Sequence, residues 1–230
     1  MNKFSNEQFL SSGFLQKLDF FSDLPTEMLN QLLIGNELVT TTSKQNLFNQ
    51  EDSADYFGFV VKGIYSLSKI NALDQRVVMD FVSPGGMIAG LIMASDTSLY
   101  PVTVQSIGSG QFLKIPKTTY RKYWMNNGQV MQKVQIANLE RVQALQSVRE
   151  TQRFSLEQKI AWVLLKLFSN FADKNNRLTI NFSRRDIADA AGVSTESIIR
   201  TFSQWSIDGI IQKNDNIESV DLLQLQSKII

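Results

Sequence analysis

The sequence predicts an α+β protein with a β-barrel or jelly roll in its N-terminal half, a long central helix and a C-terminal winged helix-turn-helix. Three observations carry this prediction. Short segments rich in aromatic and β-branched residues, interrupted by glycine, run from Glu37 to about Pro116. Residues 117–154 contain no proline and a single glycine, Gly128. Two capped helical segments joined by a glycine follow between residues 183 and 205.

The first element that we expect is a helix within residues 14–34. The stretch from Asp23 to Glu27 supplies a cap and places Pro25 near the first turn of that helix. The apolar residues that follow at helical spacing are Met28, Leu29, Leu32 and Leu33.

A change of pattern after residue 37 predicts β-structure. The segment Tyr56–Ile70 is rich in aromatic and β-branched residues, and Arg76–Val82 alternates between polar and apolar residues. Glycine clusters at 84–86 and 108–110 interrupt the run. Many short strands with frequent glycine are typical of a barrel or a jelly roll.

Beyond Gly128 the pattern predicts one long amphipathic helix over residues 128–151. A helix of this length outside a core normally packs against a partner helix, so we expect a homodimer. The heptad registers 131/135/138/142/145 and 134/138/141/145/148 both fit, and a single helix packed on its own barrel is the alternative. The residues that we expect in the dimer helix are Met131, Asn138, Val142 and Leu145.

The C-terminal third carries the most specific local signals. A helix over Ser155–Phe171 and a short strand over Leu178–Phe182 are expected first. Ser183 followed by Asp186 is a capping-box variant that opens a helix over Arg184–Ala191. Gly192 then fits the turn, since a residue with positive φ is needed there.

The second helix of this pair begins after Ser194, which is its expected cap, and runs to Trp205. The segment from Gly209 to Val220 predicts a hairpin that turns at residues 214–216. A helical pair of this kind followed by a hairpin is a winged helix-turn-helix.

Composition excludes several classes of chemistry. The chain has no cysteine and no histidine, which rules out disulfides, cysteine-held iron–sulfur clusters, catalytic Ser-His-Asp triads and the usual zinc and haem ligands. We therefore expect no cofactor and no enzymatic activity. A net charge of +1 argues against a non-specific DNA-coating protein but permits a sequence reader. No signal peptide and no apolar run of about 18 residues is present, so we expect a cytoplasmic protein without membrane contact.

This order of parts resembles the Crp/Fnr family of transcription regulators over nearly the whole chain. Residues 59–63 are similar to a strand and glycine of the family's β-roll, and residues 24–27 to its opening helix. Residues 85–91 occupy its phosphate-binding cassette, and residues 194–200 resemble its recognition helix. The resemblance implies three parts, which are a cyclic-nucleotide-binding-like β-roll sensor (1–127), a dimerisation helix (128–151) and a winged helix-turn-helix DNA-binding domain (152–230).

The cassette departs from the pattern of the nucleotide-binding members. Those members have a Gly-Glu-Leu for the ribose and an Arg-Ser for the cyclic phosphate, whereas this chain has residues 89–91 as Ala-Gly-Leu and 100–101 as Tyr-Pro. Without the carboxylate and the guanidinium, we expect no cyclic AMP binding in the usual mode. Barrel packing of residues 100–103 and a solvated Arg141 are open alternatives to ligand contact. The residues of the candidate effector pocket are Ile88, Ala89, Gly90, Leu91, Tyr100, Pro101, Val102, Thr103 and Arg141.

The resemblance also assigns DNA contacts. In the family's pattern, Arg200 reaches guanine and Glu196 accepts from cytosine, which suits a TGA-like core. Where relatives read a further guanine with arginine, this chain has Thr195, so we expect palindromic TTGA-like half-sites. The expected base contacts are Thr195, Glu196, Ser197 and Arg200, and the expected phosphate contacts are Ser183, Arg184, Arg185 and Ser194.

Three functional classes follow from these observations. The first is a dimeric, sequence-specific regulator of transcription on double-stranded DNA, with RNA polymerase as a further candidate partner. The second is a ligand-binding signalling adaptor that works through protein contacts and keeps a relict DNA-binding domain. The third, an enzyme acting in the β-roll, is disfavoured because no histidine, cysteine or carboxylate pair is available there.

Overall fold

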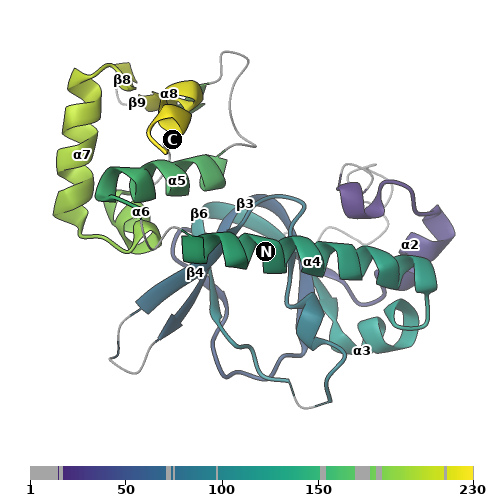
Figure 1. The fold of residues 1–230 in the computed structure, drawn as a ribbon. Helices are drawn as coiled ribbons and strands as arrows, with labels where there is room; N and C mark the ends of the chain where they lie inside the picture. Colours follow the sequence, from purple (N-terminus) through teal and green to yellow (C-terminus); the bar gives the residue numbers. More distant parts are fainter. Residues whose placement is uncertain are drawn as a thin grey trace. The chain divides into compact units, whose positions relative to one another are not determined.

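The computed structural model of the chain contains two compact units (Figure 1). One unit is formed by Met1–Lys69 and Phe81–Ala144, and the other by Ile70–Asp80 and Leu145–Ile230. The structure describes residues 15, 18–70, 74, 76–96, 98–150, 154–168, 177–179, 183–214 and 217–229.

A six-stranded sheet, most of which belongs to the first unit, has the order β1, β6, β3 and β4, while β2 pairs with β6 and β5 with β3. β1, β2 and β3 each run antiparallel to β6. This confirms the sequence-predicted β-roll. The strands are β1 (Glu37–Thr41), β2 (Asn46–Phe48), β3 (Tyr56–Ile70), β4 (Arg76–Val82), β5 (Met87–Ile88) and β6 (Thr103–Pro116).

Gly63 lets the two longest strands bend past each other. The pairing of β3 with β6 shifts register on both sides of Lys62, next to Gly63. Gly63 has φ +81°, and a Cβ there would lie 2.6 Å from the carbonyl oxygen of Ser109. Only glycine fits such a position, which explains the glycine that the sequence places in this strand.

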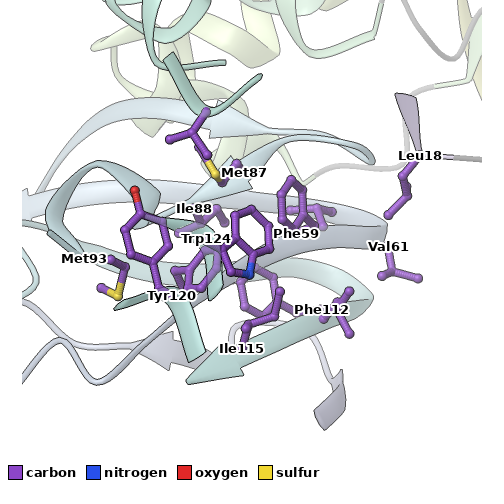
Figure 2. Close-up of a cluster of buried hydrophobic side chains, with 14 of the residues drawn as sticks. Leu18, Phe59, Val61, Met87, Ile88, Met93, Phe112, Ile115, Tyr120 and Trp124 are labelled. Atoms are coloured by element: carbon purple, nitrogen blue, oxygen red, sulfur yellow. The ribbon is translucent and has the colours of Figure 1, made fainter. Parts of the chain in front are cut away.

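Aromatic rings fill the core of the first unit (Figure 2). Trp124 is fully buried and contacts Phe57 edge-on at 4.8 Å and Phe59 face-on at 6.1 Å between ring centroids. Its Nε1 donates a hydrogen bond to the carbonyl oxygen of Leu32 at 2.9 Å. The ring of Tyr120 stacks on the same tryptophan. These aromatic side chains therefore belong to the core of the first unit.

The N-terminal helix is shorter than expected, and the expected cap does not form. A 3-10 turn, η2 (Asp19–Phe21), precedes α2 (Thr26–Leu32), whose N-cap residue is Pro25 without a side-chain hydrogen bond. Asp23 instead pairs with Lys133 of the long helix, 2.5 Å from carboxylate oxygen to ammonium nitrogen. The hydrogen bond from Lys133 lowers the pKa of Asp23. The cap prediction was wrong because α2 begins at Thr26, which leaves Asp23 two residues before the N-cap position.

The long helix α4 spans Gly128–Glu150, which confirms the predicted helix. A short helix α3 (Lys117–Thr119) and a π-helical turn η4 (Tyr120–Trp124) lead into it. Val130 and Val134 are buried in the core of the first unit. One side of α4 therefore belongs to the β-roll.

The second unit contains the predicted winged helix-turn-helix. Its three strands lie in the order β7, β9, β8, and β8 pairs antiparallel with β9 from Ile211↔Val220 to Asn214↔Ile217. The turn at residues 215–216 lies outside the described residues, as does the expected strand beyond Thr179. The elements are α5 (Leu156–Phe168), β7 (Arg177–Thr179), α6 (Arg184–Ala191), α7 (Thr195–Ile207), β8 (Ile211–Asn214), β9 (Ile217–Asp221) and α8 (Leu222–Ser227).

Candidate nucleic-acid interface and effector site

The start of α6 is fixed by a complete capping box. The Ser183 hydroxyl accepts from the backbone N–H of Asp186 at 3.1 Å, and the backbone N–H of Ser183 donates to the Asp186 carboxylate at 3.3 Å. The predicted box is confirmed. These bonds satisfy two of the free N–H groups of the first turn and hold the N-terminus of α6 in place.

A tight turn then leads from α6 into α7. Gly192 adopts φ +64° at the C-cap of α6, where a Cβ would be strained by the backbone conformation. The Ser194 hydroxyl accepts from the backbone N–H of Ser197 at 3.2 Å and caps α7. Both helix ends are therefore determined by local chemistry that the sequence displays.

The helix α7 has a buried and an exposed side. Its buried residues lie on the side that packs within the second unit, where α7 contacts α6 and where Ile187 and Ala188 of α6 are also buried. Glu196 and Arg200 are exposed on the other side, one helical turn apart, while Thr195 and Ser197 are half-buried. The buried residues of α7 are Ile198, Thr201, Phe202 and Trp205.

The electrostatics at the start of α7 keep Glu196 ionised. Hydrogen bonds from its own backbone N–H and from the Ser194 hydroxyl lower the pKa of Glu196, and the positive charge of Arg200 lowers it further. The carboxylate is thus an acceptor throughout the neutral pH range, which a contact to the amino group of cytosine requires.

The two arginines at the start of α6 lie in different surroundings. The Arg184 guanidinium lies 4.3 Å from the centroid of the Phe202 ring on α7, a cation–π arrangement, and the residue is half-buried. Arg185 is exposed. Both were expected to contact phosphates. The structure gives Arg184 a packing role as well, because it joins the two helices of the pair.

In the candidate effector region, Met87 covers Gly90. Ala89 adopts φ +64° and starts a 3-10 turn, η3 (Gly90–Ile92). A Cβ on Gly90 would lie only 2.5 Å from the Met87 sulfur, so a side chain at that position would displace Met87. Leu91 is 64% exposed and Ile88 is buried. The side chain of Met87 therefore occupies the space beside Gly90, the position at which the family resemblance would place the ribose-binding carboxylate.

Tyr100 is buried and fully engaged with the barrel. Its hydroxyl donates to the carbonyl oxygen of Tyr56 at 2.7 Å and accepts from the backbone N–H of the same residue at 3.2 Å. Its ring stacks on Phe48 with 4.3 Å between centroids. Burial raises the pKa of the Tyr100 hydroxyl well above its usual value. Tyr100 thus packs in the barrel, which was one of the two alternatives for it.

The remaining expected pocket residues lie at the start of β6, in the segment just before it and on α4. The Thr103 hydroxyl accepts a hydrogen bond from the backbone N–H of Gln50 at 3.1 Å, so it too is bound to another segment of the β-roll. Pro101 is exposed, and Val102 and Arg141 are half-buried. The side chains at 88–91 and 100–103 are all uncharged.

The exposed side of α4 differs from both expected heptad registers. Met131 packs against the β-roll core, and Val134, the first residue of the second register, is 1% exposed. Asn138 is half-buried, and the side chain of Leu145 lies outside the described residues. Among the described side chains of α4, the exposed large apolar ones are Ile136, Leu139 and Val142, which we call the α4 stripe. Ile136 and Leu139 were missed because the sequence pattern does not say which side of the helix the β-roll covers.

The described residues contain neither a cluster of metal-binding side chains nor a membrane-spanning helix. Within the described residues, no three Asp or Glu side chains gather as a metal site would require. No helix in the same part of the chain is long and apolar enough to cross a membrane.

Both units of the chain are similar to known protein families. Residues 158–228 match the model of the Crp-like helix-turn-helix domain, and residues 39–127 match that of the cyclic nucleotide-binding domain. The nitrogen fixation regulation protein FixK of Bradyrhizobium diazoefficiens is 23% identical over 90% of this chain and 87% of its own length. The transcriptional activatory protein AadR of Rhodopseudomonas palustris is 25% identical over 73% of this chain and 70% of its own length. The solved structure of FixK2 from Bradyrhizobium japonicum covers 85% of this chain and 98% of its own length, with a TM-score of 0.73 at 17% identity.

Proposed function

The chain belongs to the Crp/Fnr family and is a DNA-binding transcription regulator with a cyclic nucleotide-binding domain, and from this premise we propose that it binds a palindromic operator as a homodimer without needing cyclic AMP. The observation that carries the proposal is the exposed pair Glu196 and Arg200 on a capped helix. The proposed division is a sensor over 1–127, a dimer helix over 128–151 and a DNA-binding domain over 152–230.

The exposed side of α7 supports a specific half-site. An arginine binds O6 and N7 of guanine with two hydrogen bonds, and a glutamate accepts from the N4 amino group of cytosine. Because Glu196 and Arg200 are one turn apart, they reach the two bases of the G·C pair in a TGA-like core, the guanine on one strand and the cytosine on the other. Thr195 cannot make the two-bond contact to guanine, but its methyl suits a thymine methyl. The proposed half-site is therefore TTGA-like.

Phosphate contacts come from the first turns of α6 and α7. Arg185 is exposed at the start of α6, and the free N–H groups of both helix N-termini favour anions. We assign phosphate contacts to Arg185, Arg184, Ser183 and Ser194. Such contacts orient the helix pair on the duplex but carry no sequence information.

The α4 stripe supports a homodimer. Three large apolar side chains that are 44–57% exposed lie along the side of α4 that the β-roll does not cover. Pairing with the same stripe of a second copy removes this apolar surface from water, since a two-fold interface uses one patch twice. The dimer places two recognition helices about 34 Å apart, one turn of B-DNA.

Two positions in the β-roll support the proposal that the protein does not bind cyclic AMP in the way that nucleotide-binding relatives do. Met87 covers Gly90, and Tyr100 is bound to Tyr56 where the family has the phosphate-binding arginine. Each missing charge-assisted hydrogen bond costs roughly 1.5–3 kcal/mol of ligand affinity, so two together weaken binding by orders of magnitude. We also propose that the regulator works in the cytoplasm, where it has access to the DNA, and that RNA polymerase is a further partner.

A selection from random duplexes tests the proposal. The purified protein is expected to enrich a palindrome with TTGA-like half-sites and no cyclic nucleotide present. Thr195→Arg is the matched variant, because it adds the guanine-binding side chain and is expected to change the enriched half-site to GTGA. A guanine upstream of the TGA core with the unaltered protein, or no palindrome, would contradict the proposed half-site. If the protein retains no duplex even at low salt, this result would favour the signalling adaptor over the DNA-binding regulator.

A further inference from the structure

Two adjacent isoleucines of α7 lie in opposite surroundings. Ile198 is fully buried, whereas Ile199 is 51% exposed. Packing within the second unit explains Ile198, which lies on the same side of α7 as Phe202 and Trp205. It gives no reason for a large apolar side chain at position 199.

The position of Ile199 on α7 connects it with base reading. Ile199 lies three residues after Glu196, so the two side chains are neighbours on the exposed side of α7, and the exposed Arg200 follows directly in the chain. Glu196 and Arg200 are two of the side chains that the proposed function assigns to base edges. The isoleucine therefore enters the major groove whenever they do.

The neighbouring serines do not compete for the same space. The Ser197 hydroxyl is 3.0 Å from the Ser194 hydroxyl and takes part in the cap of α7. The Ser203 hydroxyl donates to the carbonyl oxygen of Ile199 at 2.9 Å. Both hydroxyls are bound to α7 or to its N-cap residue, which leaves Ile199 as an exposed apolar side chain next to Glu196.

We propose that Ile199 contacts the C5-methyl group of a thymine in each half-site and thereby selects an A·T pair next to the pair that Glu196 reads. The major groove offers one apolar group, the thymine methyl, and an isoleucine has no hydrogen-bonding atom with which to read anything else. The inference rests on the proposed function, since it requires α7 to lie in the major groove.

Replacement of single thymines by deoxyuridine in the selected duplex tests the inference, because this change removes only the C5-methyl group. The unaltered protein is expected to lose about fourfold in affinity per half-site at the Ile199 thymine, the contribution of one buried methyl group. Ile199→Ala is expected to abolish this loss. Ile199 is exposed, so the variant is expected to unfold at the same temperature as the unaltered protein.

Two control variants make the test specific. Ile207→Ala removes another isoleucine of α7, 79% exposed and about 12 Å further along the helix, and is expected to leave every deoxyuridine effect unchanged. Thr195→Ser removes the threonine methyl and is expected to abolish the effect at a different thymine. If Ile199→Ala keeps the full deoxyuridine effect while Arg200 still reads its guanine, the inference is wrong and the proposed function stands. If no palindrome is selected, both are wrong.

Discussion

The candidate effector region and the N-terminal half of α7 are both assigned to binding, but their side chains are arranged in opposite ways. In the effector region Tyr100 is buried, and its hydroxyl both donates to and accepts from Tyr56. On α7, Glu196 and Arg200 are exposed on a helix whose start is held by Ser194. A polar group that is already paired inside the protein gains little from a ligand, whereas an exposed pair on a rigid helix can exchange water for base edges.

The largest expected effect comes from separating the two copies of α7. Leu139→Asp together with Val142→Asp places charges in the α4 stripe and is expected to give monomers. Operator affinity then falls by about 10²–10⁴-fold, because the second half-site no longer binds intramolecularly. Sedimentation velocity and a DNA titration measure both. Met125→Asp, a charge at another apolar site with 45% exposure, is the control. An unaltered protein that is monomeric at concentrations where it fills its operator would contradict the homodimer.

The next largest effect is expected from the exposed pair itself. Arg200→Ala is expected to cost about 1–3 kcal/mol of binding free energy per half-site and to relax selectivity at one base pair. The measurement is the affinity for the selected duplex and for its variants at the guanine. Equal losses on all duplexes would mean that Arg200 contacts a phosphate.

The two arginines of α6 are expected to differ in kind. Arg185→Ala is expected to weaken all duplexes alike and to reduce the slope of log K against log salt by about 0.9 per half-site. Arg184→Ala is expected in addition to lower the stability of the second unit, by about 0.5–2 kcal/mol, because the contact with the Phe202 ring is lost. Salt titrations and thermal unfolding separate the two effects. Unchanged stability of Arg184→Ala would show that the ring contact contributes nothing.

The smallest effect on DNA binding is expected from the β-roll. Tyr100→Phe removes the hydroxyl to which the backbone N–H and carbonyl groups of Tyr56 are hydrogen-bonded. The loss of these bonds is expected to lower the stability of the first unit by about 1–3 kcal/mol. The operator affinity of the folded protein is expected to stay within twofold. A large loss of affinity with unchanged stability would show that this region transmits a signal instead of merely packing.

The helix-turn-helix was predictable because its signals are local. The capping box of Ser183 and Asp186, the positive φ of Gly192 and the cap at Ser194 each depend on a few neighbouring residues, and all three occur as predicted. The helix α8 followed the same rule and was missed. Its signal was Asp221, whose carboxylate caps the helix, ahead of apolar residues at helical spacing.

The residues that the sequence could not place depend on contacts between distant segments. Val134 fits a heptad as well as a core position, and only the β-roll packed against α4 decides between them. Arg184 contacts Phe202 on the next helix, and Asp23 meets Lys133 across more than a hundred residues. The family resemblance places Tyr100 where relatives have a ligand-binding arginine, but the hydrogen bonds of Tyr100 to Tyr56 join segments that are brought together only by the folded barrel.

The affinity for the selected palindrome, measured with and without saturating cyclic AMP, tests the contrast between the two regions most directly. We propose that the exposed pair on α7 binds DNA without a nucleotide, and Met87 lies against Gly90 while Tyr100 is bound to Tyr56, so we expect the same dissociation constant in both conditions. Calorimetry of the protein with cyclic AMP is expected to show no micromolar binding. Micromolar, exothermic cyclic AMP binding that strengthens operator affinity would contradict the account.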